Sequence, residues 1–179
     1  MKINKHLTAC ICISALLSSV IFSRAEEIKP RVESRGSTNV IRQAVDGSVI
    51  LRAKDATTHG TTIRYEPQPH KNTIGYWTKA DDWVSWDFKL RTPGSFTVEL
   101  TQACGKGSGG SDYTVTIGEQ TLIDKVPDTG AFTNFVNRKI GTVKLDKPGD
   151  YTVSVKPITK PGPAVMDLRA ITLIPRTTE

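Results

Sequence analysis

Two stretches of the sequence combine aromatic rings with amide or cationic side chains. The first contains Trp77 and Lys79, and the second contains Phe132, Asn134 and Asn137. A flat ring stacks on the apolar C–H face of a sugar, and amide groups supply directed hydrogen bonds to its hydroxyls. In the alternative interpretation, the phenylalanines of the second stretch plug the end of the fold, because large aromatic side chains are usually buried. The residue types favour a carbohydrate-binding site made by these five residues, with Lys79 as a contact for an anionic group.

The histidines, cysteines and carboxylates show no spacing that is typical of catalysis or of a tight metal site. His59 and His70 are separated by an expected strand and a loop with prolines, and no His-x-His or Cys-x-x-Cys pair occurs. A Gly-x-Gly-x-x-Gly match at residues 105–110 precedes an alternating strand, whereas a dinucleotide site needs a helix there. The following aspartates are expected in turns or on solvent faces: Asp81, Asp82, Asp87, Asp112 and Asp124. We therefore predict no catalytic residues and no enzyme.

A hairpin at residues 77–100 is the element around which the candidate residues are arranged. Apolar residues occupy alternate positions in both of its strands: Val84, Trp86 and Phe88, then Phe96, Val98 and Leu100. Period-two alternation places one set of side chains on a buried face and the other set in water. The intervening Thr92-Pro93-Gly94-Ser95 matches a type II turn. We therefore predict that Trp86, Phe88 and Phe96 lie in the core of a β-sandwich, and that Trp83, at the opposite parity, lies outside it.

Further alternating segments with turn residues between them follow along the chain, and no stretch shows a helical period over a useful length. Strands are expected at residues 48–53, 61–65, 112–117, 121–126, 139–145, 151–155 and 166–174, and residues 131–138 are expected to be rich in turns. The predicted fold class is therefore all-β, with a single β-sandwich. Cys104 follows one of these strands and is expected to be a small, semi-buried filler.

Residues 1–25 have the composition of a secretory signal peptide. A short basic start precedes an apolar run at residues 7–22, and Ser23-Arg24-Ala25 offers small residues at the two positions that a signal peptidase reads. We expect cleavage after Ala25, a polar linker at 26–47 whose end joins the fold, a domain at 48–176, and a secreted or periplasmic location. The formal net charge of +6 falls on cleavage, because the leader carries three basic residues and no acidic one. The small remaining excess is scattered, which argues against nucleic acid or membrane insertion.

The order of motifs resembles the family 6 carbohydrate-binding modules and their galactose-binding-like relatives, including the β-sandwich modules attached to secreted sulfatases and fucosidases. The similarity covers about residues 48–174 and rests on six segments: Ala53–Ala56, Asp82–Trp86, Pro93–Val98, Thr129–Phe132, Pro148–Val153 and Val165–Leu168. It implies a jelly-roll sandwich that binds polysaccharide or another glycan, and an association with secreted hydrolases or sulfatases. The excess of Lys and Arg favours an acidic or sulfated polysaccharide.

The resemblance also implies a structural calcium ion, with Asp55 and Asp167 as its ligands here. Lys54 stands where the family has a calcium-binding glutamate, and its charge repels a cation. Val165 and Phe132 replace a sugar-binding asparagine and a tryptophan of the family. The leading hypothesis is a secreted, non-catalytic carbohydrate-binding module. The alternatives are an exported module for protein–protein adhesion or assembly, and a glycan-active hydrolase or sulfatase-associated component.

Overall fold

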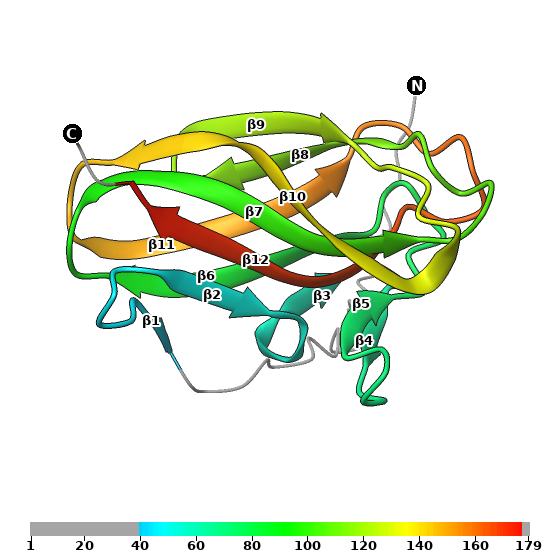
Figure 1. Cartoon of the computed structure of the whole chain (residues 1–179), viewed down its shortest axis with the longest axis horizontal. Coiled ribbons are helices and arrows are strands. Elements are labelled where there is room, and N and C mark those ends of the chain that lie inside the picture. The colour runs from blue at the N-terminus through cyan, green and yellow to red at the C-terminus, as the bar shows by residue number, and fades with distance from the viewer. Residues whose placement is uncertain (1–39, 177–179) are drawn as a thin grey trace, which may run out of the picture. The chain divides into compact units, whose positions relative to one another are not determined.

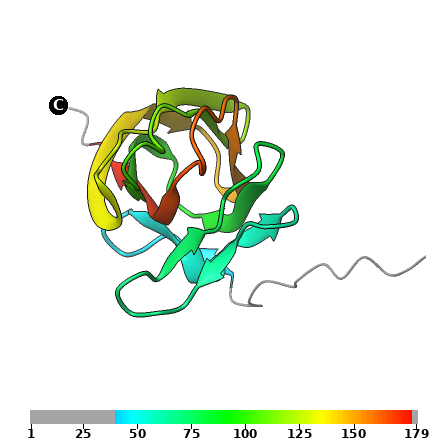
Figure 2. The same ribbon diagram turned by 90° about the vertical axis from the view of Figure 1, so that its right-hand side faces the viewer.

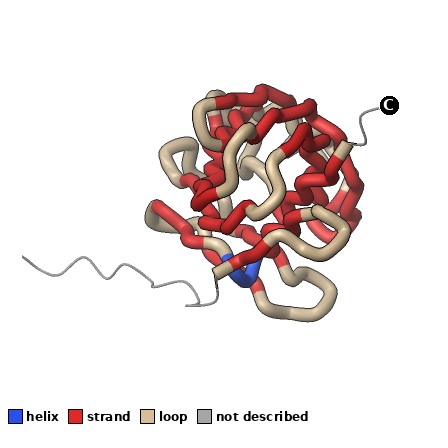
Figure 3. Tube along the Cα trace, turned by 90° about the vertical axis from the view of Figure 1, so that its left-hand side faces the viewer, coloured by secondary structure: helices blue, strands red, loops and turns tan. Residues whose placement is uncertain are grey.

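The computed structural model describes residues 40–176, and its strands form two sheets that face each other (Figure 1). The expected signal peptide and residues 26–39 of the expected linker lie outside the described residues. Within them, no helix has the length and apolarity that a membrane crossing requires. The helical content of this part is one short 3-10 turn, η1 (Ala53–Asp55), which Figure 3 shows among the strands.

Sheet 1 has the strand order β1-β6-β11-β8-β9, and β3 pairs with β6 as well. Its strands are β1 (Ile41–Arg42), β3 (Thr57–His59), β6 (Trp83–Leu90), β8 (Asp112–Ile117), β9 (Gln120–Lys125) and β11 (Gly149–Pro157). The β1–β6 pair is parallel, and the other pairs are antiparallel. The end of the expected linker therefore joins the fold, because β1 lies within residues 26–47 and pairs with β6.

Sheet 2 has the strand order β10-β7-β12-β5-β4, and β2 pairs with β12. Its strands are β2 (Val49–Arg52), β4 (Arg64–Glu66), β5 (Thr73–Gly75), β7 (Gly94–Cys104), β10 (Ala131–Leu145) and β12 (Asp167–Pro175). All of its pairs are antiparallel. Viewed from the right-hand side of Figure 1, the two sheets enclose a common interior (Figure 2).

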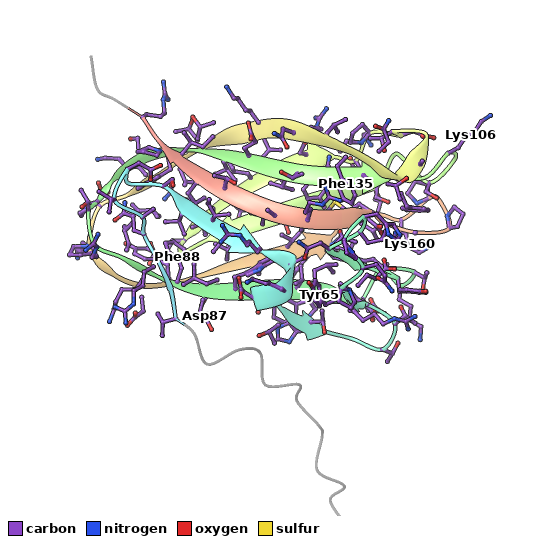
Figure 4. All side chains as sticks on the ribbon, turned by 60° about the horizontal axis from the view of Figure 1, so that its bottom comes forward. Tyr65, Asp87, Phe88, Lys106, Phe135 and Lys160 are labelled. Carbon is purple, nitrogen blue, oxygen red and sulfur yellow. The ribbon has the colours of Figure 1, made fainter. Side chains whose placement is uncertain are left out.

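The core lies between the sheets and has the composition that the alternation predicts. Trp86, Phe88 and Phe96 are each 1% exposed, and the indole N–H of Trp86 donates to the Arg52 carbonyl oxygen at 2.8 Å. Phe88 points into the interior, whereas its neighbour Asp87 points outward (Figure 4). The predicted all-β sandwich is therefore confirmed. The predicted hairpin is wrong, because β6 lies in sheet 1 and β7 in sheet 2, so the turn between them joins strands that face each other across the core and do not pair.

Residues 131–138 are not a turn-rich segment, because they form the first half of β10. The register between β10 and β7 shifts between Ala131 and Val136 and again between Lys139 and Gly141. A register shift of this kind turns side chains away from strict alternation, which hides the strand from a period-two analysis. The consequence is that Phe132 and Phe135 project from a strand of sheet 2 and not from a loop.

Candidate functional site

Trp77 is a core residue and cannot stack on a sugar, so the prediction for this residue is wrong. Its side chain is 0% exposed, and its indole N–H donates to the carbonyl oxygen of Asp82 at 2.8 Å. The backbone N–H of Val165 donates to the Trp77 carbonyl oxygen at 2.8 Å, which fixes the segment from the other side. Lys79, two residues further on, is exposed as expected.

The neighbouring Tyr76 is the aromatic ring that this segment presents to solvent. It is 50% exposed, and the guanidinium carbon of Arg64 lies 3.4 Å from the centre of its ring. Its φ of 53° is a rare value for a bulky residue. Asn72 (φ 44°) is the other described non-glycine residue with a positive φ, so these two residues flank β5, Asn72 before it and Tyr76 after it. Such backbone strain concentrates at ligand-binding and catalytic positions, which draws attention to this strand.

Phe132 is half-buried on β10, and its ring rests on the backbone at Gly105. A Cβ atom at Gly105 would lie 2.4 Å from the ring, so a larger residue there would displace the Phe132 ring. Asn134 and Asn137 are both exposed on the same strand. The Asn134 amide donates to the Thr129 carbonyl oxygen at 2.7 Å, and the Asn137 side-chain oxygen accepts from the Thr101 hydroxyl at 2.8 Å. Both amides are therefore held in place.

A lysine and two carboxylates meet beside Phe132. The sequence spacing does not indicate that these three residues form a group. The Lys71 ammonium pairs with Glu66 at 3.3 Å and contacts Asp167 more closely. The side chains are 17%, 11% and 5% exposed, respectively. The Lys71 nitrogen also lies 5.7 Å from the centre of the Phe132 ring. The group thus joins the β4–β5 hairpin to the beginning of β12 and to β10.

Arg169 holds this arrangement together from a bulge in β12. The register with β7 skips Arg169, since Leu168 faces Gln102 and Ala170 faces Thr101. Its guanidinium donates to the His70 carbonyl oxygen at 2.9 Å and to the Lys71 carbonyl oxygen at 2.9 and 3.0 Å. The same guanidinium lies 3.5 Å from the centre of the Phe135 ring. Bulges often re-aim a side chain next to a functional site, and this one aims Arg169 across the sheet.

We name these residues the loop-end cluster: Glu66, Lys71, Phe132, Phe135, Asp167 and Arg169. Its charges balance, with two cations and two carboxylates. Burial is the main reason why the pKa of Asp167 rises to about 6, and the charge of Glu66 adds to the rise while Lys71 opposes it. Burial alone would lower the pKa of Lys71, but Asp167 and Glu66 raise it above its usual value, so the ammonium stays charged.

The calcium site expected at Asp55 and Asp167 does not fit this geometry. The carboxylate of Asp167 is paired with the Lys71 ammonium, which holds the position that a cation would need. Asp55 lies in η1 and lines a groove beside β1 that includes Arg42 and Arg52. Within residues 40–176, no group of three or more His, Cys, Asp and Glu side chains is placed to hold a metal ion.

A second aromatic feature lies on the outer face of sheet 1. The rings of His59 and Trp83 stack with centroids 3.6 Å apart and planes at 7°, and the Lys156 nitrogen lies 4.3 Å from the Trp83 ring. His59 is the last residue of β3 and faces Trp83 across the β3–β6 pair. Trp83 lies outside the core as its parity predicts, between a ring on β3 and a cation on β11.

Three other expectations concern Asp82, Cys104 and the glycine-rich segment at residues 105–110. Asp82 is 2% exposed and not in solvent, because its carboxylate accepts the backbone N–H groups of Thr61, Thr62 and Ile63 at 3.0 Å. Cys104 is fully buried, and burial raises the pKa of its thiol to about 11. The glycine-rich segment 105–110 leads into strand β8, so it is not a dinucleotide fingerprint.

The sequence at residues 60–178 matches the family described as domain of unknown function DUF5077. No curated protein matches the chain. Among solved structures, a family 35 carbohydrate-binding module from Clostridium thermocellum has a TM-score of 0.59 at 16% identity, over 72% of this chain and 98% of that one.

Two further solved structures share the fold. The C-terminal family 6 module of the laminarinase LamC from Zobellia galactanivorans has a TM-score of 0.57 at 18% identity, over 71% of this chain and 98% of that one. The family 35 module of Abf62 from Cellvibrio japonicus gives 0.57 at 18% identity, over 73% and 94%. The fold is thus that of the galactose-binding-like sandwiches, as the order of motifs predicts.

Proposed function

The chain belongs to the DUF5077 family. Because its fold is that of carbohydrate-binding modules, we propose that the protein is a non-catalytic module and that it binds carbohydrate at the loop-end cluster. The carrying observation is that two phenyl rings and four charged side chains from β4, β10, β12 and the β4–β5 loop meet at one place. The side chains of the cluster are held in place without a ligand, because contacts of Arg169 and Lys71 already connect β12 with the β4–β5 loop.

The chemistry of the cluster suits a hydroxyl-rich ring. The half-buried Phe132 and Phe135 offer apolar surface for C–H groups, while the nearly buried Glu66 and Asp167 hold the segments around these rings in place. The Asn134 and Asn137 side chains are exposed on the same strand as the rings and offer amide groups to sugar hydroxyls. Tyr76, directly after β5, offers a further ring, with one face covered by Arg64 and half of its surface exposed. It takes the role that the sequence had given to Trp77.

We also propose that the preferred glycan is an acidic or sulfated polysaccharide. The cluster itself is neutral, so an anionic group must be met by cations around it. Lys106 is exposed, and Lys106 and Lys160 lie at the same end of the sandwich as Phe135 (Figure 4). Lys79 is also exposed, and we propose it as a further contact for an anionic group. Ionic contacts of this kind weaken with added salt, which separates them from stacking.

The proposal places the protein outside the cytoplasm, in the secreted or periplasmic fraction, because of the composition of residues 1–25. A single shallow contact binds a sugar weakly, so useful retention comes from several modules on one polymer. Association with secreted hydrolases or sulfatases would supply that multiplicity and a substrate-directed role.

Affinity electrophoresis with matched neutral, carboxylated and sulfated polysaccharides tests the proposal. Wild type should be retarded by at least one acidic polymer, and Phe132→Ala should weaken this binding roughly 10-fold, which corresponds to about 1.4 kcal/mol. Trp83→Ala is the matched control, because it removes an aromatic ring from the opposite sheet and should leave binding unchanged. Retardation that is lost in Trp83→Ala but kept in Phe132→Ala would place the site on sheet 1. Absence of binding to every polymer would favour a protein partner instead.

A further inference from the structure

We infer that the Lys71 ammonium is a built-in counter-ion that replaces a bound divalent cation at Glu66 and Asp167, so that the fold needs no metal there. This inference concerns how the site is assembled and does not depend on whether the ligand is a carbohydrate. It rests on the pairing of one nearly buried lysine with two nearly buried carboxylates from different strands.

The two carboxylates need a cation because they lie close together and are poorly solvated. Their side chains are only 11% and 5% exposed, and both press against the backbone at Gly75. A Cβ atom at Gly75 would lie 2.0 Å from a Glu66 carboxylate oxygen and 3.0 Å from an Asp167 oxygen. Two like charges in a poorly solvated place repel each other strongly unless a positive charge lies between them.

Lys71 is held so that its ammonium supplies that charge. Its carbonyl oxygen accepts two hydrogen bonds from Arg169, and the next residue, Asn72, has a positive φ that turns the chain into β5. The Asn72 side chain is fixed in turn by the Tyr65 hydroxyl at 2.8 Å. The ammonium is thus delivered from a rigid loop and can donate to both carboxylates at once.

A divalent ion such as calcium requires six to eight oxygen ligands. With Lys71 present, the carboxylate oxygens face an ammonium, and the nearby carbonyl oxygens of His70 and Lys71 accept from Arg169. The residues therefore do not fit a bound calcium ion. Removal of the ammonium leaves two close carboxylates without a counter-ion, which is the beginning of a divalent-cation site.

Thermal unfolding in EDTA and in millimolar CaCl₂ tests this inference. Wild type should show the same Tm in both, and Lys71→Met should lose about 5–10 °C in EDTA, since one partner of a nearly buried ion pair is gone. Calcium should restore a substantial part of that loss in Lys71→Met and none of it in Lys71→Met/Asp167→Asn. Lys125→Met is the matched control, because Lys125 pairs with Asp112 on the exposed surface and its removal should give neither effect.

Each contrary result decides against the inference. A wild-type Tm that drops in EDTA shows that the fold uses a bound metal, and a Lys71→Met variant that calcium does not stabilise shows that the pair is not a cation site.

A triple variant, Glu66→Gln/Lys71→Met/Asp167→Asn, separates charge from packing. It should be more stable than Lys71→Met, and equal or lower stability would mean that the ammonium acts by filling space. If Lys71→Met is unfolded in EDTA, the readout is refolding on addition of calcium, and failure to refold in calcium while the triple variant folds refutes the inference.

Discussion

Acidification from about pH 7.5 to about pH 5 is expected to stabilise the protein, because of Asp167. The pKa of this carboxyl is raised from 3.8 to about 6, chiefly by burial and further by Glu66, against the pull of Lys71. A group whose pKa is higher in the folded state binds its proton more tightly when folded. Stability therefore grows as the pH falls through the folded pKa, and the gain is complete only below the pKa of the unfolded chain.

The expected size follows from the two pKa values. A difference of roughly two pKa units corresponds at most to about 3 kcal/mol. About 1.4 kcal/mol of this is gained between pH 7.5 and pH 5, where the folded carboxyl takes up its proton and the unfolded one does not yet. The pKa of Asp82 is lowered instead, because its hydrogen bonds outweigh the effect of burial. Its contribution is lost only below about pH 4, outside this window.

Urea unfolding followed by tryptophan fluorescence measures the effect, since Trp77 and Trp86 are buried. The free energy of unfolding of wild type should rise by about 1.4 kcal/mol on going from pH 7.5 to pH 5. Asp167→Asn should show no such rise, whereas any contribution from a histidine would persist in this variant. A flat or falling wild-type profile, or an equal rise in Asp167→Asn, would refute the assignment of this carboxyl.

Three further predictions concern the support of the site and the core. Gly105→Ala should weaken polysaccharide retardation about as much as Phe132→Ala, because the new Cβ would lie 2.4 Å from the Phe132 ring and displace it. Unchanged retardation would show that Phe132 does not touch the ligand. Asp82→Ala should lower the free energy of unfolding by about 3 kcal/mol or more, since three backbone N–H groups lose their acceptor, and a loss below about 1 kcal/mol in urea titrations would contradict this. Cys104 should not react with a thiol reagent at about pH 8 until urea unfolds the chain, because burial raises the pKa of its thiol to about 11 and blocks access of the reagent. Rapid labelling of the native protein would contradict its place in the core.

The sandwich core is predictable from sequence because strand alternation is local information. The spacing of Trp86, Phe88 and Phe96 states which face is buried without reference to the rest of the chain. The same local rule is silent for Trp77, which lies between β5 and β6 in a segment with no alternation. Its burial depends on a hydrogen bond to Asp82 and on packing, so the exposed ring had to be found one residue away at Tyr76.

The loop-end cluster was predictable only in part. Phe132 was identified from its residue type, but its strand was hidden by the register shifts in β10. The contact between Lys71 and Asp167 joins residues 96 positions apart, and no spacing rule links a loop lysine to the start of a distant strand. A glycine at position 75, at the end of strand β5, was the local sign of a close approach there, and its meaning needed the coordinates.

Strand β12 also determines how the protein can be attached to a support. It starts at Asp167 in the loop-end cluster and runs roughly 30 Å to Pro175. Pro175 lies against Gly47 and the β6–β7 turn, where the described chain emerges in Figure 3. A linker or bead joined after residue 176 would therefore hold the molecule by the far end of the sandwich. Immobilised in this way, the protein would present the loop-end cluster outward, toward whatever polymer flows past.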